Sequence, residues 1–473
     1  MRATVRAALQ RAAKPPVPVE VEVPPVGPVD QLVDSFGLDT VLLATVDVQG
    51  RLKGKEFDAA GLVRRLASGA LTPEMCAYVL GTDLGMTPAA SGPFSWQSGF
   101  GDVALLPGLQ QARVLPWLPD TALVLAEPVS GGWPHPLAPS TALAEQLHRL
   151  AGRGLVPAVG IETEFVVYEG TARDAAAAGW QGLRPAVWDN RDYALDQPLL
   201  VREFSRRLRR VLAGAGMPVE AVKGEGAAGQ VEVTFPYGEA VAACEQHVLF
   251  KHAARAVADE QGLTVSFMAA PSTGVGSGMH LHVSLADFED RTVLAADPED
   301  GTELSELGNQ AVAGLLAVLP EVAPLWAPYV NSYKRLADHS FAPARLAWGR
   351  DNRTCAVRVV GHGRSLRLEV RLPGADANPM LALTAVVAGI RHGIDAGLKP
   401  PPATSGYAWE QHDAPLVPQS LDEAVRAFEA SALAGELLGE PLVAHLARIA
   451  RMDLDHHAAR VTDAEVERGL AQA

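Results

Sequence analysis

Pairs of polar residues two positions apart recur inside four apolar segments of the sequence. Side chains alternate between the two faces of a β-strand, so residues i and i+2 lie on the same face. Lysine is absent from these four predicted faces, whereas glutamate, histidine and arginine dominate them. Their members are Glu162 and Glu164; Gln230 and Glu232, with Glu225 just upstream; His280, His282 and Ser284; and Arg367, Glu369 and Arg371.

These residue types favour a site for cations and phosphate. One such pair alone is typical of the solvated face of an antiparallel sheet, but four pairs with so uneven a composition indicate a charged cavity. Clustered carboxylates raise one another's pKa, and a divalent ion relieves that cost. Mg²⁺ and Mn²⁺ bind carboxylate oxygens, Mn²⁺ also accepts imidazole, and arginine matches phosphate oxygens. The residues alone therefore predict binding of metals and phosphate, but they do not name a reaction.

The surrounding sequence predicts mixed α/β structure. Residues 40–57 (TVLLATVDVQGRLKGKEF) have the pattern of a β-hairpin, and a helix is expected near residues 58–69. Apolar residues at helical spacing predict helices over 141–152, 198–214, 240–260 and 379–395. Ser420 with Glu423 and Thr462 with Glu465 have the spacing of capping boxes, which open helices.

Composition bounds the domain organisation and the class of protein. The 473 residues are 48% hydrophobic, and the Pro-, Gly- and Ser-rich segment 128–140 indicates a boundary. We expect a Pro-rich leader over 1–29, a small domain over 30–130 and a larger domain over 131–473.

Charge and cysteine content exclude several functions. With 40 Lys+Arg against 55 Asp+Glu, the net charge of −15 argues against a nucleic-acid partner. No apolar run has the length of a membrane span, and the N-terminus lacks the apolar core of a secretory signal. Cys76, Cys244 and Cys355 are too few and too far apart for a disulfide framework or a Cys-type zinc site, which fits a cytoplasmic location.

Six segments, in this order, resemble the signature segments of glutamine synthetases: GIETEF, GEGAAGQVEV, GVGSGMHLHVSL, NSYKRL, WGRDNR and LEVRLPGADANPMLAL. They are most similar to those of the relatives that make γ-glutamyl polyamines and other γ-glutamyl amines. The resemblance implies a β-grasp-like N-terminal domain and a larger catalytic domain with a mainly antiparallel curved sheet covered by helices. It also implies two stacked hexameric rings, in which the N-terminal domain of one subunit completes a neighbour's site.

The resemblance also implies roles for individual residues. One set would bind the first divalent metal, Mg²⁺ or Mn²⁺: Glu164, Glu225 and Glu232. A second set would bind the second metal, next to the ATP phosphates: Glu162, His280 and Glu369. The nucleotide site would comprise Ser284, His282, Arg367 and Arg364, with Arg353 and Arg358 on the transferring phosphoryl group. Arg335, Arg371 and the backbone at Gly276 would hold glutamate.

One segment departs from the family pattern in a way that bears on the substrate. In ammonia-using members a glutamate of the flap helps to deprotonate ammonium, whereas here Asn331 to Pro343 reads NSYKRLADHSFAP, with Phe341 at that place. A phenyl ring accepts no proton, but it can pack against a larger amine or meet a cation through its face. Asp83 is the nearest candidate for the ammonium-pocket aspartate. His339 and Asp338 are candidate bases or, alternatively, ordinary loop residues.

The predicted function is an ATP-dependent ligase that phosphorylates the γ-carboxylate of glutamate and joins it to an organic amine such as a polyamine, ethanolamine or another alkylamine. Three alternatives stay open at this point. They are an ammonia-using glutamine synthetase, a ligase acting on another acid, suggested by Val275, and a non-catalytic binding protein.

Overall fold

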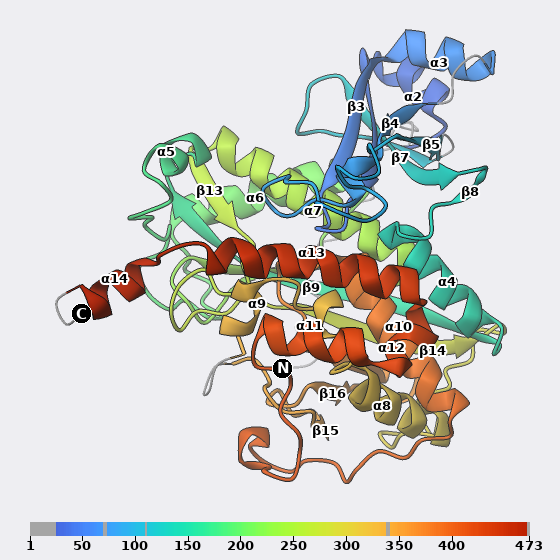
Figure 1. Ribbon diagram of the computed structural model, residues 1–473, viewed down its shortest axis with the longest axis vertical. Coiled ribbons are helices and arrows are strands. Elements are labelled where there is room, and N and C mark those ends of the chain that lie inside the picture. Colours follow the sequence, from blue (N-terminus) through green and yellow to red (C-terminus); the bar gives the residue numbers. More distant parts are fainter. Residues whose placement is uncertain (1–24, 70–72, 109–110, 337–340, 471–473) are drawn as a thin grey trace, which may run out of the picture.

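The computed structural model describes residues 25–69, 73–108, 111–336 and 341–470, and it contains two sheets that helices surround (Figure 1). The predicted α/β class is confirmed. The boundaries proposed for the domains stay a prediction, and most of the leader lies outside the described residues. Within the described part of the chain, no helix is long and apolar enough to cross a membrane.

The first sheet is built from the N-terminal region. Its eight strands include the central order β1-β6-β7-β2-β3, and two helices, α2 (Val29–Phe36) and α3 (Ala59–Ala67), belong to the same region. The strands are β1 (Val26–Gly27), β2 (Thr40–Val46), β3 (Leu52–Asp58), β4 (Glu74–Cys76), β5 (Asp102–Pro107), β6 (Ala112–Val114), β7 (Thr121–Ser130) and β8 (Trp133–Pro134).

The predicted hairpin over residues 40–57 is confirmed, because β2 and β3 pair antiparallel from Thr40 opposite Asp58 onwards. Residues of the turn itself stabilise it. The Asp47 carboxylate accepts hydrogen bonds from the backbone N–H groups of Gln49 and Arg51, at 3.0 and 2.8 Å. Gly50 supplies the positive φ of 75° that the turn requires. The turn contacts the second part of the chain, because the Asn378 side chain donates to the carbonyls of Asp47 and Val48.

The second sheet has nine strands and follows the order β10-β11-β9-β14-β17-β16-β15, with β12 and β13 also paired to β9. All its pairs are antiparallel except β15 with β16. The strands are β9 (Leu155–Glu169), β10 (Ala221–Gly224), β11 (Gln230–Thr234), β12 (Gly238–Glu239), β13 (Leu263–Ser266), β14 (Met279–Asp287), β15 (Trp348–Arg350), β16 (Val357–Val360) and β17 (Arg367–Val370).

The predicted helices are present with small shifts of their ends. The helices of this part are α4 (Pro139–Ala151), α5 (Ala172–Ala177), α6 (Leu199–Gly214), α7 (Ala240–Glu260), α8 (Glu306–Val318), α9 (Val330–Lys334), α10 (Pro379–Asp395), α11 (Leu421–Ala430), α12 (Ala432–Leu438), α13 (Glu440–Ala458) and α14 (Asp463–Gly469). Thr462 and Glu465 form the predicted capping box, whereas Glu423 reaches back to Gln419 and Ser420 caps the Glu423 N–H.

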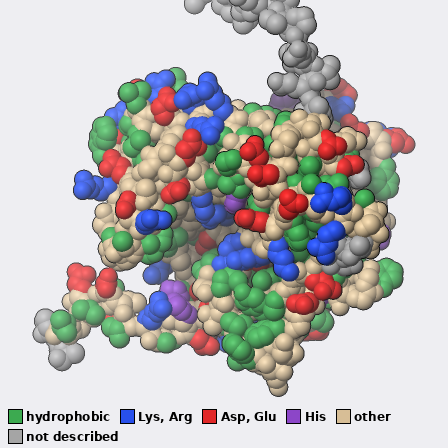
Figure 2. All heavy atoms as spheres, turned by 90° about the horizontal axis from the view of Figure 1, so that it is seen from above, with side chains coloured by type: hydrophobic (Ala, Val, Ile, Leu, Met, Phe, Trp, Pro, Cys, Tyr) green, Lys and Arg blue, Asp and Glu red, His purple; other side chains and the backbone are tan. Residues whose placement is uncertain are grey.

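The central strand β9 separates the core from the site. Phe165 on its apolar face packs edge-on against Phe204 of α6 and Phe250 of α7, with ring centroids 6.1 and 5.7 Å apart. Val159, Ile161, Thr163 and Val167 of that face are also buried. The opposite face carries Glu162 and Glu164, as the alternation predicts. Figure 2 shows that one side of the molecule is hollowed, with Lys, Arg and His side chains at the hollow.

Candidate active site

Strand register brings polar residues together from five strands. Glu164 lies opposite Glu232 where β9 pairs with β11, and Glu162 lies opposite His280 where β9 pairs with β14. Further along the sheet, His282 lies opposite Glu369, which in turn lies opposite Arg358. Residues distant in the sequence therefore share one face of the sheet.

Two groups of three potential ligands result. The ligand atoms of Glu162, His280 and Glu369 all lie within 4.8 Å of one another, and so do those of Glu164, Glu225 and Glu232. These are the two sets that the family resemblance implies, and the structure brings each of them together; their role as metal ligands stays a prediction.

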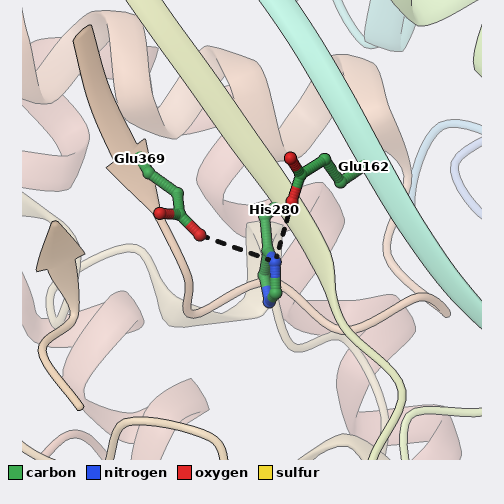
Figure 3. A group of neighbouring side chains, drawn as sticks. All are labelled: Glu162, His280 and Glu369. Atoms are coloured by element: carbon green, nitrogen blue, oxygen red, sulfur yellow. Dashed lines mark ion pairs between the residues drawn. The ribbon is translucent and has the colours of Figure 1, made fainter. Parts of the chain in front are cut away.

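The His280 ring lies between the two groups. Its Nδ1 is 3.6 Å from Glu162 Oε2 and 3.7 Å from Glu369 Oε1 (Figure 3), and its Nε2 is 3.8 Å from Glu164 Oε1. The exposed fraction of the side chain is only 5%. β14 therefore places this ring between carboxylates of both groups.

The electrostatics of the cluster fit a divalent cation. Burial, together with the charges of Glu162 and Glu225, raises the pKa of Glu232 to about 9. Burial and like charges therefore disfavour the ionised form of Glu232, and a divalent cation among these carboxylates would favour it. Burial alone would raise the pKa of Glu162 as well, but interactions with His280 and His282 bring it below its ordinary value. Hard oxygen donors with one imidazole suit Mg²⁺ or Mn²⁺.

Two arginines, Arg358 and Arg371, balance the negative charge of Glu369. Arg358 Nη1 donates to Glu369 Oε2 at 2.8 Å, and Arg371 Nη1 contacts Glu369 Oε1. Burial opposes ionisation, but Arg371 and the neighbouring histidines and Arg358 lower the pKa of Glu369 to about 2. The group is therefore anionic throughout the physiological range.

The remaining predicted phosphate and nucleotide residues lie on β14 and β17 and in the loops beside β16. Arg367 Nε donates to His282 Nδ1 at 3.2 Å, and Ser284 lies on the same face of β14. Arg353 is exposed, and its carbonyl accepts a hydrogen bond from Arg371 Nε at 3.1 Å. Arg364 lies further out, where it pairs with Asp290 at 3.4 Å.

Two glycines allow the predicted glutamate loop to pack closely against Arg335. A Cβ at Gly278 would lie 2.6 Å from Arg335 Nη2 and 2.7 Å from His280 Nε2, and one at Gly276 would lie 3.0 Å from Arg335 Cγ. Arg335 is buried, and it donates to the carbonyls of Leu372 and Arg371 at 2.9 and 3.2 Å. At these two positions glycine lets the loop pack against Arg335 without displacing its side chain or that of His280.

Two predicted residues of the described chain, Asp83 and Phe341, belong to neither ligand group. Asp83 lies in the N-terminal region, where its Oδ1 accepts a hydrogen bond from the Thr87 backbone N–H at 2.7 Å. Phe341 is 94% exposed. His339 lies outside the described residues, so its candidacy as a base stays a prediction.

Lys223 was not singled out by the sequence analysis. It lies on β10 opposite Glu232, and its Nζ contacts Glu225. The signal was available, because Lys223 and Glu225 are two positions apart. However, the four-residue strand that carries Lys223 has no clear alternation of its own.

Two groups of three potential metal ligands with arginines beside them have the residue types expected of a phosphate-handling, metal-dependent site. The sequence comparison specifies the class of protein. Residues 136–469 match the family model described as the catalytic domain of glutamine synthetase. This chain therefore belongs to the glutamine synthetase family.

Individual relatives and solved structures are similar over nearly the whole chain. Gamma-glutamylethanolamide synthetase GlnA4 of Streptomyces coelicolor is 41% identical over 97% of this chain and 98% of the relative. A glutamate–isopropylamine ligase of a Pseudomonas species is 29% identical over 93% and 97%. Among solved structures, a GmaS/ADP complex matches with a TM-score of 0.79 and 25% identity, over 94% of this chain and 99% of that one.

Proposed function

We propose that this protein is an ATP-dependent ligase that phosphorylates the γ-carboxylate of glutamate and condenses the product with an organic amine. The observation that carries the proposal is the convergence of the two ligand groups on one sheet face of a chain 41% identical to a gamma-glutamylethanolamide synthetase. That relative makes ethanolamine the first amine to test.

The two groups would hold two divalent ions, Mg²⁺ or Mn²⁺: Glu164, Glu225 and Glu232 the first, and Glu162, His280 and Glu369 the second. When bound, such ions would neutralise the charge of the ATP phosphates. Arg353 and Arg358 would stabilise the charge on the transferring phosphoryl group. His282, Ser284, Arg367 and Arg364 would contact the nucleotide.

Glutamate activation follows from simple chemistry. A carboxylate is a poor electrophile, whereas an acyl phosphate can be attacked by an amine, with phosphate as the leaving group. Arg335 and Arg371 would hold the glutamate carboxylates, and Gly276 would let the backbone approach the amino acid. The attacking amine must lose a proton because alkylammonium groups have pKa values near 10. His339 and Asp83 are the proposed acceptors, and Phe341 would border the amine.

Amine selectivity tests this function. Purified protein with ATP, Mg²⁺ and glutamate should release phosphate faster with ethanolamine, isopropylamine or a polyamine than with ammonium, and mass spectrometry should detect the γ-glutamyl amide. Faster turnover with ammonium would reject the amine ligase in favour of a glutamine synthetase, and no turnover with any of them would reject both.

We further propose a cytoplasmic homo-oligomer of two stacked hexameric rings. The three free cysteines support the location, and the place of Asp83 away from the ligand groups supports a site completed by a neighbouring subunit. Native mass spectrometry should give twelve times the mass of one chain, and a monomer active at the same concentration would contradict the ring.

A further inference from the structure

The ammonium of Lys223 lies beside the carboxylates of Glu225 and Glu232, two of the three residues of the first ligand group. Its Nζ contacts Glu225 Oε1 and lies 3.7 Å from Glu232 Oε2, and its side chain is only 22% exposed. The antiparallel pairing of β10 with β11 fixes Lys223 opposite Glu232. The ammonium therefore occupies oxygens that a metal ion would need.

The charges explain why the Lys223 ammonium stabilises the three carboxylates and also why it opposes the binding of a metal ion. Three carboxylates carry a charge of −3 when ionised, and the ammonium offsets one of these charges when no ion is bound. A divalent ion would bring the sum to zero. However, an ammonium and a metal ion that share an oxygen repel each other strongly at separations of a few ångströms.

The ammonium already lies within reach of a second set of partners, Asp192 and Tyr193, which offer it a place when it leaves the carboxylates. Asp192 Oδ1 is 3.9 Å from Lys223 Nζ, and the centroid of the Tyr193 ring is 4.5 Å away. An exposed carboxylate and an aromatic face both attract a cation. Lys223 and Tyr193 also border one cavity of about 420 Å³, so the side chain has room to move.

The loop that carries these two residues, residues 189–197, is fixed against β10. The Tyr193 N–H donates to the Gly224 carbonyl at 3.3 Å, and Gln197 Nε2 donates to the carbonyls of Arg191 and Ala194. A Cβ at Gly224 would lie 2.4 Å from Gln197 Nε2, so the loop is packed directly on the strand. Asp192 and Tyr193 are therefore built into the surroundings of the lysine.

We propose that Lys223 is a positioning residue with two places: it holds Glu225 and Glu232 when the first metal group is empty, and it moves to Asp192 and the Tyr193 ring when an ion binds. Lys223 thereby sets the affinity of this group for its ion and makes the ion exchangeable. The inference rests on the proposed function, in which Glu164, Glu225 and Glu232 bind a metal.

Binding of Mn²⁺ alone to the full-length protein tests the competition, with free Mn²⁺ measured by electron paramagnetic resonance. Lys223→Met and Lys223→Gln remove the charge, whereas Lys223→Arg keeps it as a matched control. We expect both neutral variants to bind the first-group ion about tenfold more tightly or better, and Lys223→Arg to stay within about threefold of wild type. Glu164→Gln identifies the first-group ion by its loss. Damage to the fold would weaken binding, so it cannot mimic this gain.

Asp192→Asn tests the second place. In the wild-type background it should weaken Mn²⁺ binding severalfold, because the displaced ammonium loses its partner, and in the Lys223→Met background it should have no effect. Equal effects in both backgrounds would overturn the two-place inference, and so would unchanged or weaker binding in both neutral variants. If the inference about Lys223 is overturned but the wild-type protein still binds two Mn²⁺ ions, the proposed function survives. If neither wild type nor Lys223→Met binds Mn²⁺, both fail.

Discussion

Glu369 on β17 is fully buried and contacts Arg358 and Arg371 directly. Removing its charge would leave the buried Arg371 without its carboxylate partner and Arg358 paired only with Asp351. Breaking a buried ion pair by removing one partner is strongly destabilising. We expect Glu369→Gln to lower the free energy of unfolding by about 3 kcal/mol and kcat/KM by at least about 100-fold.

Urea unfolding and steady-state kinetics check this prediction. Glu289→Gln is the matched control, because the Glu289 side chain is 73% exposed and its surface ion pair contributes little. An active Glu369→Gln enzyme would show that the ligand group is not used in turnover.

Phe341 allows a test of amine choice at one position. The exposed ring leaves space for a carboxylate, which can attract ammonium and accept its proton. Phe341→Glu should raise the ratio of kcat/KM for ammonium to kcat/KM for ethanolamine about tenfold, below the ~10²–10⁴-fold that a well-positioned base provides. Phe341→Gln introduces a side chain with the shape of glutamate but no charge, and it should leave this ratio near that of wild type. Equal ratios for the two variants would rule out a role for charge here.

At the level of elements, the sequence predicts which side chains share a face but not which of them meet. The alternation in β9 places Glu162 and Glu164 together, and the structure confirms this. Glu164 lies opposite Glu232, 68 positions further along the chain (232 − 164), because of the register between β9 and β11. No local sequence pattern determines that register. The family resemblance, rather than periodicity, supplied the two ligand sets. Lys223 was missed because β10 is short and ends in glycine.

Glycines set the contact between helices α8 and α10. A Cβ at Gly314 would lie 2.1 Å from the Gly389 carbonyl oxygen and 2.5 Å from the Gly393 nitrogen, so the helix backbones touch directly. Gly314→Ala should therefore force the helices apart and lower the free energy of unfolding by about 3 kcal/mol. Gly469→Ala in α14, where a Cβ meets nothing within 4 Å, should change it by less than about 1 kcal/mol. Similar urea midpoints for the two variants would contradict the close packing.

At the level of the whole molecule, His445 joins the C-terminal helices to the N-terminal region. Its Nε2 lies 2.8 Å from the Leu80 carbonyl oxygen, and its ring meets Phe94 edge-on at 5.6 Å. Burial lowers the pKa of His445 to about 4 from an ordinary 6.5. Between these two pH values the His445 imidazole is protonated in the unfolded chain but neutral in the folded chain. The free energy of unfolding therefore decreases as the pH falls.

This linkage predicts a pH dependence that can be measured. Between pH 6.5 and pH 4, His445 alone should cost the wild type up to about 3 kcal/mol of unfolding free energy. His445→Gln, which can still donate to Leu80, should show a shallower loss over this window, whereas His457→Gln, at an exposed position, should follow wild type. Parallel urea-unfolding curves for wild type and His445→Gln would contradict the low pKa.

The spacing between the two ligand groups is dictated by the covalent chain itself. Glu162 and Glu164 are separated by one residue of β9, roughly 6–7 Å along a strand, and each belongs to a different group. A slip of this strand by one position would turn both carboxylates into the apolar interior at once. Substitutions in the surrounding loops can therefore change what the scaffold accepts, while β9 itself keeps the interval between the two charged centres constant.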